Sequence, residues 1–179
     1  MILGEAIREG DLAIDATAGN GHDTAFLAER VGATGKVVAF DIQQEAIVSA
    51  CSKITAMGIA ERVEFHQLSH SRIGECVAPG TASAAMFNLG YLPGGDHSLA
   101  TSAGETLAAL EAAALTLKPG GILSVVCYPG HNGGAGEAEE VERLLHSWTG
   151  NGWRLAKYAL QATLRPAPFL LIAAKPSGV

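Results

Sequence analysis

The sequence is poor in cysteine and has no long apolar run. Cys51, Cys76 and Cys127 lie far apart and form no Cys-x-x-Cys pair, so neither a disulfide framework nor a zinc site is favoured and we expect a reducing compartment. No run approaches the roughly 18 apolar residues of a membrane span, and the first residues lack the pattern of an export signal. We therefore expect a cytoplasmic protein with no membrane partner and no bound metal.

Positive charge is also scarce. The chain has 12 lysines and arginines against 18 acidic residues, which gives a formal net charge of −6. Broad affinity for nucleic acid comes from basic side chains that neutralise phosphates, so we expect no DNA partner, and an RNA substrate would need a local basic patch. Arg154, Lys157, Arg165 and Lys175 gather near the C-terminus, either as such a patch or as ordinary solvated surface.

Short apolar runs alternate with helical patterns along all 179 residues. This alternation is typical of βαβ units on a parallel sheet, and the length fits one domain over residues 1–179. The expected strands are Leu12–Asp15, Lys36–Asp41, Val63–His66, Ala82–Asn88, Gly121–Cys127, Trp153–Leu160 and Phe169–Lys175. The expected helices are Asp23–Val31, Gln44–Met57, Ser71–Val77, Thr101–Leu117 and Glu137–Trp148.

The longest expected helix has a regular apolar face. Leu107, Leu110, Ala114 and Leu117 recur at steps of three and four residues, which predicts that this face packs on the sheet. The segment Lys118-Pro-Gly-Gly121 should end the helix. Glycine-rich residues 130–136 are expected to form a mobile loop.

A glycine-rich loop, Asp15-Ala-Thr-Ala-Gly-Asn-Gly-His-Asp23, follows the first strand and opens a helix. Gly19 and Gly21 permit a tight turn and close approach of a ligand. A dinucleotide would place its diphosphate at the helix N-terminus, where Asp23 would repel it. S-adenosylmethionine instead carries a sulfonium and an ammonium group, which favour the oxygens of Asp15, Asn20 and Asp23. Asp23 could alternatively be a simple first-turn acid.

Further polar residues follow the second and third strands. Asp41 lies 22 residues beyond Gly19 (41 − 19), where an acidic residue that binds ribose hydroxyls is expected, although a strand-end aspartate is often a turn residue. Gln43 could contact the adenosine as well. Ser69 and His70 lie in the loop that would hold the adenine, whereas His66 could be purely structural.

The substrate side is predicted at Asn88-Leu-Gly-Tyr-Leu-Pro-Gly-Gly-Asp96, because ligands of open α/β sheets bind beyond the carboxyl ends of the strands. Methyl transfer is an in-line displacement that chiefly needs an aligned nucleophile. If that nucleophile is an alkylamine, we expect the Asn88 amide oxygen and the Leu89 carbonyl to orient it and Tyr91 to stack on a base. Asp96 or His97 would then receive the proton. A core role for Tyr91 and a simple turn at residues 93–95 are the alternatives.

A second loop, Tyr128-Pro-Gly-His131, follows the fifth expected strand and should face the same cleft. Tyr128 and His131 could contact substrate there, or the loop could act as a lid. His131 has no identifiable carboxylate partner in the sequence, so a binding or exposed role is favoured over that of a general base.

The glycine-rich loop at residues 15–23, the segment at 88–96 and the segment at 128–131 carry a family resemblance. Together they resemble the small rRNA methylase-like family of class I S-adenosylmethionine-dependent methyltransferases, which includes bacterial tRNA 5-aminomethyl-2-thiouridine methyltransferases. The resemblance extends from Asp11 to Lys175. It implies a Rossmann-like fold with a seven-stranded, mostly parallel sheet, helices on both faces and an antiparallel last strand. It also implies N-methylation of that wobble uridine in tRNA, a homodimer, and cofactor contacts from Asn20, His22, Asp23, Asp41, Gln43, Ser69 and His70.

The chain departs from that family in places that concern the substrate. His97 stands where the family favours lysine, and Arg165-Pro-Ala-Pro-Phe169 replaces a stretch that reads Asn-Pro-Pro-Phe in relatives. The alternatives are a methyltransferase for rRNA or a small molecule, a nicotinamide-dependent oxidoreductase, and a non-catalytic RNA-binding module. The missing third glycine of G-x-G-x-x-G, replaced by Thr24, disfavours the oxidoreductase.

Overall fold

A computed structural model of the chain describes residues 6–90, 103–130 and 133–178. Its strands are β1 (Leu12–Asp15), β2 (Lys36–Asp41), β3 (Val63–Gln67), β4 (Ala82–Asn88), β5 (Leu117–Cys127), β6 (Arg154–Ala159) and β7 (Phe169–Ala174). The helices are α2 (His22–Val31), α3 (Gln44–Ala56), α4 (Ile73–Cys76), α5 (Ala103–Thr116) and α6 (Gly134–Ser147). Short 3-10 turns are η1 (Ala60–Arg62), η2 (His70–Arg72) and η4 (Trp148–Asn151).

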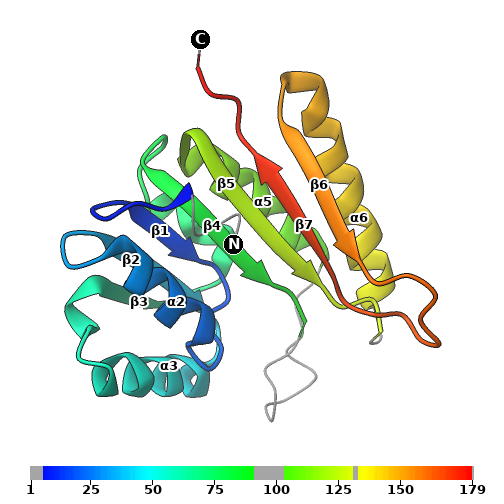
Figure 1. Cartoon of the computed structure of the whole chain (residues 1–179). Helices are drawn as coiled ribbons and strands as arrows, with labels where there is room; N and C mark the ends of the chain where they lie inside the picture. Colours follow the sequence, from blue (N-terminus) through cyan, green and yellow to red (C-terminus); the bar gives the residue numbers. More distant parts are fainter. Residues whose placement is uncertain (1–5, 91–102, 131–132, 179) are drawn as a thin grey trace.

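The strands form one sheet in the order β3-β2-β1-β4-β5-β7-β6 (Figure 1). All neighbouring pairs from β3 to β5 are parallel, whereas β7 runs antiparallel to both β5 and β6. The chain moves outward from β1 in one direction and from β4 in the other, so the switch point lies between these two strands. This arrangement confirms the expected fold class and predicts a ligand site beyond the ends of β1 and β4.

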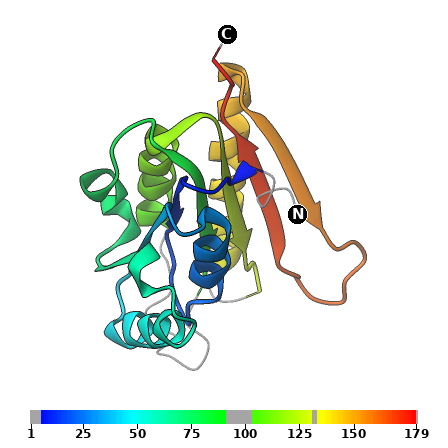
Figure 2. The same cartoon turned by 60° about the vertical axis from the view of Figure 1, so that its left-hand side comes forward.

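Helices cover the sheet on both faces, and the strand sequences reflect this. Alternate residues of a strand point to opposite faces, and β4 sends Ala85 and Phe87 into the core beneath α5 and α6, while Ala84 and Met86 pack with α2 residues such as Leu27. Because both faces are covered at β4, its residues from Ala84 to Phe87 are apolar instead of alternating with polar ones. Figure 2 shows the two helical layers from the side.

Most expected element bounds agree with the structure within a few residues, and β1, β2 and β4 have the bounds expected. Residues 118–121 were expected to end the preceding helix, and α5 does end just before them, at Thr116. They do not form a separate turn, because β5 begins at Leu117 and includes them. The expected face of α5 is confirmed in part: Leu110 is fully buried and Leu107 packs against the core, whereas Ala109 and Ala113 are also fully buried and Ala114 is only half-buried. Small alanines allow the close approach of α5 to its neighbours, which side-chain periodicity alone does not reveal.

The glycine-rich segment after β5 is shorter than expected. Gly133 adopts a left-handed conformation (φ 82°) as the N-cap of α6, and the helix begins at Gly134. Helix α6 therefore starts three residues before the expected Glu137, and residues 134–136 belong to a helix instead of a loop.

Candidate cofactor and substrate site

The glycine loop between β1 and α2 turns tightly and lies directly against α3. Gly21 has a φ of 74°, and a Cβ there would lie 2.8 Å from the Ala50 Cα atom. The backbone N–H of Gly21 donates to the Ala18 carbonyl at 2.7 Å, and that of Ala18 donates to the Phe40 carbonyl at 2.8 Å. Position 21 thus needs glycine for its backbone conformation and for its packing.

Asp41 at the end of β2 is held by the loop backbone. The N–H of Gly19 donates to one carboxylate oxygen at 2.9 Å, and the N–H of Gln43 donates to the other at 2.9 Å. A carboxylate offers about four lone-pair sites, so each oxygen can accept one more hydrogen bond. The two N–H groups orient the Asp41 carboxylate, and its binding of two ribose hydroxyls through the remaining acceptors stays a prediction.

Asp15 lies beneath the loop and is fully buried. Its carboxylate accepts hydrogen bonds from the Thr17 N–H at 3.1 Å and from the Thr24 hydroxyl at 2.5 Å. Burial raises the pKa of Asp15 to about 7, and the nearby charges of Asp23 and Asp41 add to the increase against the lowering effect of these hydrogen bonds. The side chain fixes the loop from below, and direct contact with a cofactor stays a prediction.

The raised pKa of Asp15 gives a testable pH dependence. A folded-state pKa of about 7 lies above the ordinary aspartate value of 3.8, so the folded protein retains a proton that the unfolded chain loses. The stabilisation from this proton is complete below about pH 4 and is lost as the pH rises toward 7. Replacing Asp15 with asparagine removes the titration, so stability relative to the unmodified protein should increase by roughly 2–3 kcal/mol between pH 5 and pH 8.

Urea unfolding of both proteins at pH 5, 6.5 and 8 measures this difference. An exposed Glu139→Gln variant on α6 serves as the control and should follow the unmodified protein at every pH. Identical pH profiles for Asp15→Asn and the unmodified protein would mean that the buried carboxyl does not retain its proton.

Two side chains of helix α3 contact predicted cofactor residues. The Ser49 hydroxyl donates to the Asn20 amide oxygen at 3.2 Å, which leaves the Asn20 N–H groups for a ligand. The Lys53 ammonium lies 2.8 and 3.0 Å from the two ring nitrogens of His22. Sequence reasoning missed Ser49 and Lys53 because only the packing of α3 against the loop brings them there.

The loop is also joined to the predicted substrate strand. The Asn88 backbone N–H donates to the Thr17 hydroxyl at 2.8 Å, and the Asn88 side-chain N–H donates to Asp23 over a long 3.4 Å. Asp23 lies in the first turn of α2, so a carboxylate occupies the place where a diphosphate would be stabilised by the helix N-terminus. With its amide nitrogen turned to Asp23, Asn88 presents its oxygen as an acceptor.

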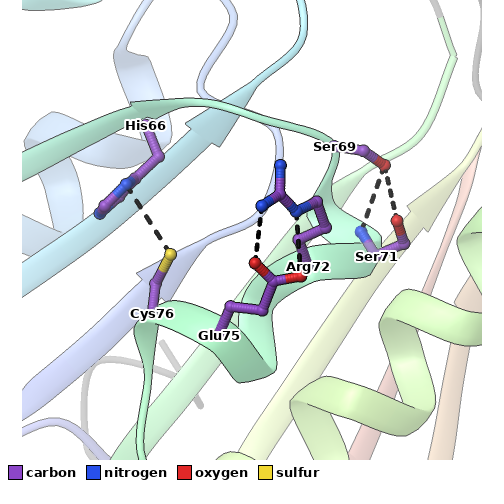
Figure 3. A network of polar contacts seen from close by, with 6 residues as sticks. All are labelled: His66, Ser69, Ser71, Arg72, Glu75 and Cys76. Carbon is purple, nitrogen blue, oxygen red and sulfur yellow. Dashed lines mark hydrogen bonds and ion pairs between the residues drawn. The ribbon is translucent and has the colours of Figure 1, made fainter.

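Ser69 and His70 follow β3 as predicted and form the turn η2. Ser69 caps this turn through the Ser71 N–H at 3.3 Å and contacts the Ser71 hydroxyl at 2.9 Å (Figure 3). The His70 ring lies against Phe87 with 5.8 Å between centroids. Burial lowers the pKa of His70 and outweighs the hydrogen bond with the Ala16 backbone and the nearby carboxylates, which raise it, so the neutral ring is favoured near pH 7 and suits contact with an uncharged base.

His66 belongs to the structural part of the same region. Its ring stacks on Phe40 with 5.3 Å between centroids, and its Nδ1 lies 3.8 Å from the Cys76 sulfur (Figure 3). Burial raises the pKa of the Cys76 thiol, which argues against a reactive thiolate. The Arg72–Glu75 ion pair beside it is exposed, with hydrogen bonds of 3.0 and 2.6 Å.

Besides Asn88, two predicted substrate residues fall within the described part of the chain. The Leu89 side chain is buried, and its backbone N–H donates to the Val126 carbonyl at 3.0 Å. Tyr128 is 37% exposed and lies beside Gly90. Tyr91, Asp96, His97 and His131 lie outside the described residues, so their roles stay predictions. Within residues 6–90, 103–130 and 133–178, no group of three or more His, Cys, Asp and Glu residues is placed to hold a metal ion.

Comparison with known proteins is consistent with this geometry. The model of the family described as "Putative rRNA methylase" matches residues 37–174. A chloroplastic tRNA (mnm(5)s(2)U34)-methyltransferase of Arabidopsis thaliana is 43% identical over 96% of this chain, which spans 65% of that relative's length.

Two solved structures are similar over 97% of this chain and 93% of their own. One is a "putative rRNA-methylase" from Clostridium thermocellum, with a TM-score of 0.93 and 37% identity. The other is a "putative methyltransferase" from Streptococcus mutans in complex with SAH, with a TM-score of 0.87 and 31% identity. These relatives confirm the expected resemblance and agree with the expected cofactor class.

Two observations bear on the cellular location of the protein. Among the described residues, no helix is long and apolar enough to cross a bilayer. The Arabidopsis relative is named as chloroplastic, so the cytoplasmic location expected from the sequence stays a prediction.

Proposed function

Because this chain belongs to the family described as "Putative rRNA methylase", we propose that it is an S-adenosylmethionine-dependent methyltransferase that N-methylates 5-aminomethyl-2-thiouridine at the wobble position of tRNA. The main support is the charge at the switch point, where Asp23 and Asp41 border one loop and Asn88 reaches it from β4. The tRNA (mnm(5)s(2)U34) substrate in the name of the Arabidopsis relative supports the choice of nucleoside.

The residues present suit this cofactor chemically. Asp41 can accept from the two ribose hydroxyls, and neutral His70 lies where the adenine is expected. When bound, S-adenosylmethionine supplies an electrophilic methyl group on a positively charged sulfur. The carboxylate of Asp23 favours that charge, whereas it would oppose a diphosphate.

Asn88 orients the nucleophile in this proposal. The substrate amine has a pKa of about 10, so it must lose a proton before it attacks. The Asn88 oxygen then accepts a hydrogen bond from the neutral amine and directs its lone pair toward the methyl carbon. A C–N bond forms as the S–CH₃ bond breaks, and the methylated amine later releases its second proton. Asp96 and His97 are the predicted acceptors of these protons.

Replacing Asn88 with alanine should lower kcat about 10- to 100-fold while the Kd for S-adenosylmethionine changes less than about threefold. The expected loss corresponds to one hydrogen bond of about 1–3 kcal/mol that positions the amine. Loop geometry should persist, because Thr17 binds the backbone of Asn88 and not its side chain. Single-turnover kinetics and calorimetry measure the two quantities.

Asn151→Ala is a matched control, because this exposed asparagine lies in η4, outside the loop and the β4 end. Near-normal turnover of an Asn88→Ala enzyme that still binds cofactor would rule out the orienting role. A parallel loss in both variants would point to a general effect on folding instead.

Mass analysis of nucleosides tests the substrate. Bulk tRNA from cells that lack this modification is incubated with the protein and methyl-labelled S-adenosylmethionine, and the RNA is then digested. We expect label on 5-methylaminomethyl-2-thiouridine. Label on ribosomal RNA in a parallel reaction, with none on tRNA, would support an rRNA methyltransferase in its place. A homodimer, which the resemblance implies, is part of the proposal and is measured by light scattering.

A further inference from the structure

A row of side chains crosses four neighbouring strands from the predicted reaction centre to the edge of the sheet. The pairing of β4, β5, β7 and β6 places Asn88, Val126, Leu170 and Tyr158 side by side. Residues paired across strands point to the same face, and Asn88 contacts Asp23 of α2. The row therefore lies on the α2 face of the sheet and spans about 14 Å, which is three strand spacings.

Among the residues that the structure describes, no helix covers this face beyond β4. Helices α2 and α3 pack on β1, β2 and β3, and Figure 1 shows no described helix in front of β5, β7 and β6, while α5 and α6 lie behind them. Tyr158 is 72% exposed at the end of the row. Neighbouring strand residues such as Cys127 and Leu171 point the other way, into the core beneath α5 and α6. Val126 and Leu170 are half-buried within the row, so the row is a largely apolar strip that is most accessible at Tyr158.

The loop between β6 and β7, residues 160–168, borders the same end of the sheet. A Cβ on Gly130 would lie 3.3 Å from the Pro166 carbonyl oxygen, so this loop touches the segment that follows β5. The loop exposes Leu160 and Leu164, which are 62% and 105% accessible, together with Arg165. Within the described ranges, Arg165 has no ion-pair partner, whereas Lys157 on the opposite face pairs with Glu142.

We propose that this open strip, defined as Asn88, Val126, Leu170, Tyr158 and residues 160–168, binds the single-stranded RNA nucleotides that flank the reacting uridine. The inference rests on the proposed function, because the reacting base must sit at Asn88 and its covalently linked neighbours must then lie within a few strand spacings. Apolar and aromatic surfaces stack unpaired bases, and arginine contacts phosphates. Tyr158 stacks on a base, and Arg165 contacts the backbone.

Binding of an RNA stem-loop with a seven-nucleotide uridine-containing loop tests the strip without any methyl transfer. Stacking of one base is worth about 1–3 kcal/mol, so Tyr158→Ala should weaken binding about tenfold in fluorescence anisotropy at fixed salt, while Tyr158→Phe stays within about twofold. Arg165→Ala should reduce the slope of log affinity against log salt by about 1. Leu115→Ala is the control, since this 68% exposed leucine lies on α5.

The possible outcomes separate this inference from the proposed function. Unchanged RNA binding by Tyr158→Ala, or no RNA binding by the unmodified protein, overturns the strip. A change from dimer to monomer in Tyr158→Ala, measured by light scattering, also overturns it and identifies a surface between copies of the chain. If the unmodified protein binds the stem-loop through Tyr158 but never methylates aminomethyl-thiouridine in tRNA, the strip stands and the proposed substrate is wrong.

Discussion

Replacing Asp41 with alanine should weaken S-adenosylmethionine binding at least about 100-fold. The carboxylate is held by the N–H groups of Gly19 and Gln43 at 2.9 Å each, and its two remaining acceptor sites fit two ribose hydroxyls. Hydrogen bonds to a charged group contribute about 1.5–3 kcal/mol each, so the loss of two exceeds the roughly 2.7 kcal/mol that corresponds to about 100-fold. Isothermal titration calorimetry measures the change in Kd.

A matched control removes a carboxylate from the neighbouring strand. Glu64 on β3 is exposed and contacts His66 instead of the loop, so Glu64→Ala should bind cofactor normally. Circular dichroism establishes that Asp41→Ala is folded. A folded Asp41→Ala protein with an unchanged Kd for S-adenosylmethionine would contradict the predicted contact between Asp41 and the ribose.

Replacing Gly21 with alanine should lower the free energy of unfolding by about 2–4 kcal/mol and abolish measurable cofactor binding. The φ of 74° disfavours any side chain by roughly 1–2 kcal/mol. The added Cβ would also lie 2.8 Å from the Ala50 Cα atom, which forces the loop or α3 to move. That movement would displace the Gly19 N–H that orients Asp41. Urea unfolding measures the stability, and calorimetry measures the binding.

A substitution at Gly58 separates the backbone cost from the cost of the clash with α3. It has a similar φ of 70°, but a Cβ added there would meet nothing within 4 Å. Gly58→Ala should therefore show only the backbone cost of roughly 1–2 kcal/mol and keep its cofactor affinity. Equal effects of the two substitutions would mean that packing of the loop on α3 is unimportant.

The parts of the fold that are local in sequence were predictable. Strands β1, β2 and β4 are mostly apolar and end in an aspartate or asparagine, and their bounds match the expectation. The 22-residue spacing of Gly19 and Asp41 predicted that Asp41 binds ribose hydroxyls; the structure places Asp41 beside the glycine loop, where the Gly19 N–H donates to it, and the contact with ribose stays a prediction. Both inferences depend on one βαβ unit, whose geometry is similar wherever it occurs.

Features that depend on the packing of distant elements were not predictable. The contacts of Ser49 and Lys53 with the loop require the rotation of α3 about its axis, and they join residues 29 and 31 positions apart. The burial of Ala109 and Ala113 depends on how α5 packs against its neighbours. Periodicity describes which residues share a face but not how near a neighbouring element comes.

On the substrate side, too, only the features that are local in sequence were predictable. Asn88 was found because it ends a buried strand, and the structure places it beside Asp23. The open strip, which runs from Asn88 to Tyr158, was not predicted, since it exists only through the order β4-β5-β7-β6. No single segment of sequence carries that pattern.

The central claim is that the loop after β1 accepts a positively charged sulfonium cofactor and disfavours a diphosphate. Calorimetric titration of the protein with S-adenosylmethionine and, separately, with NAD⁺ tests it most directly. We predict saturable, one-to-one binding of S-adenosylmethionine and no measurable binding of NAD⁺ at the same concentrations. Tight binding of NAD⁺ without binding of S-adenosylmethionine would contradict the account.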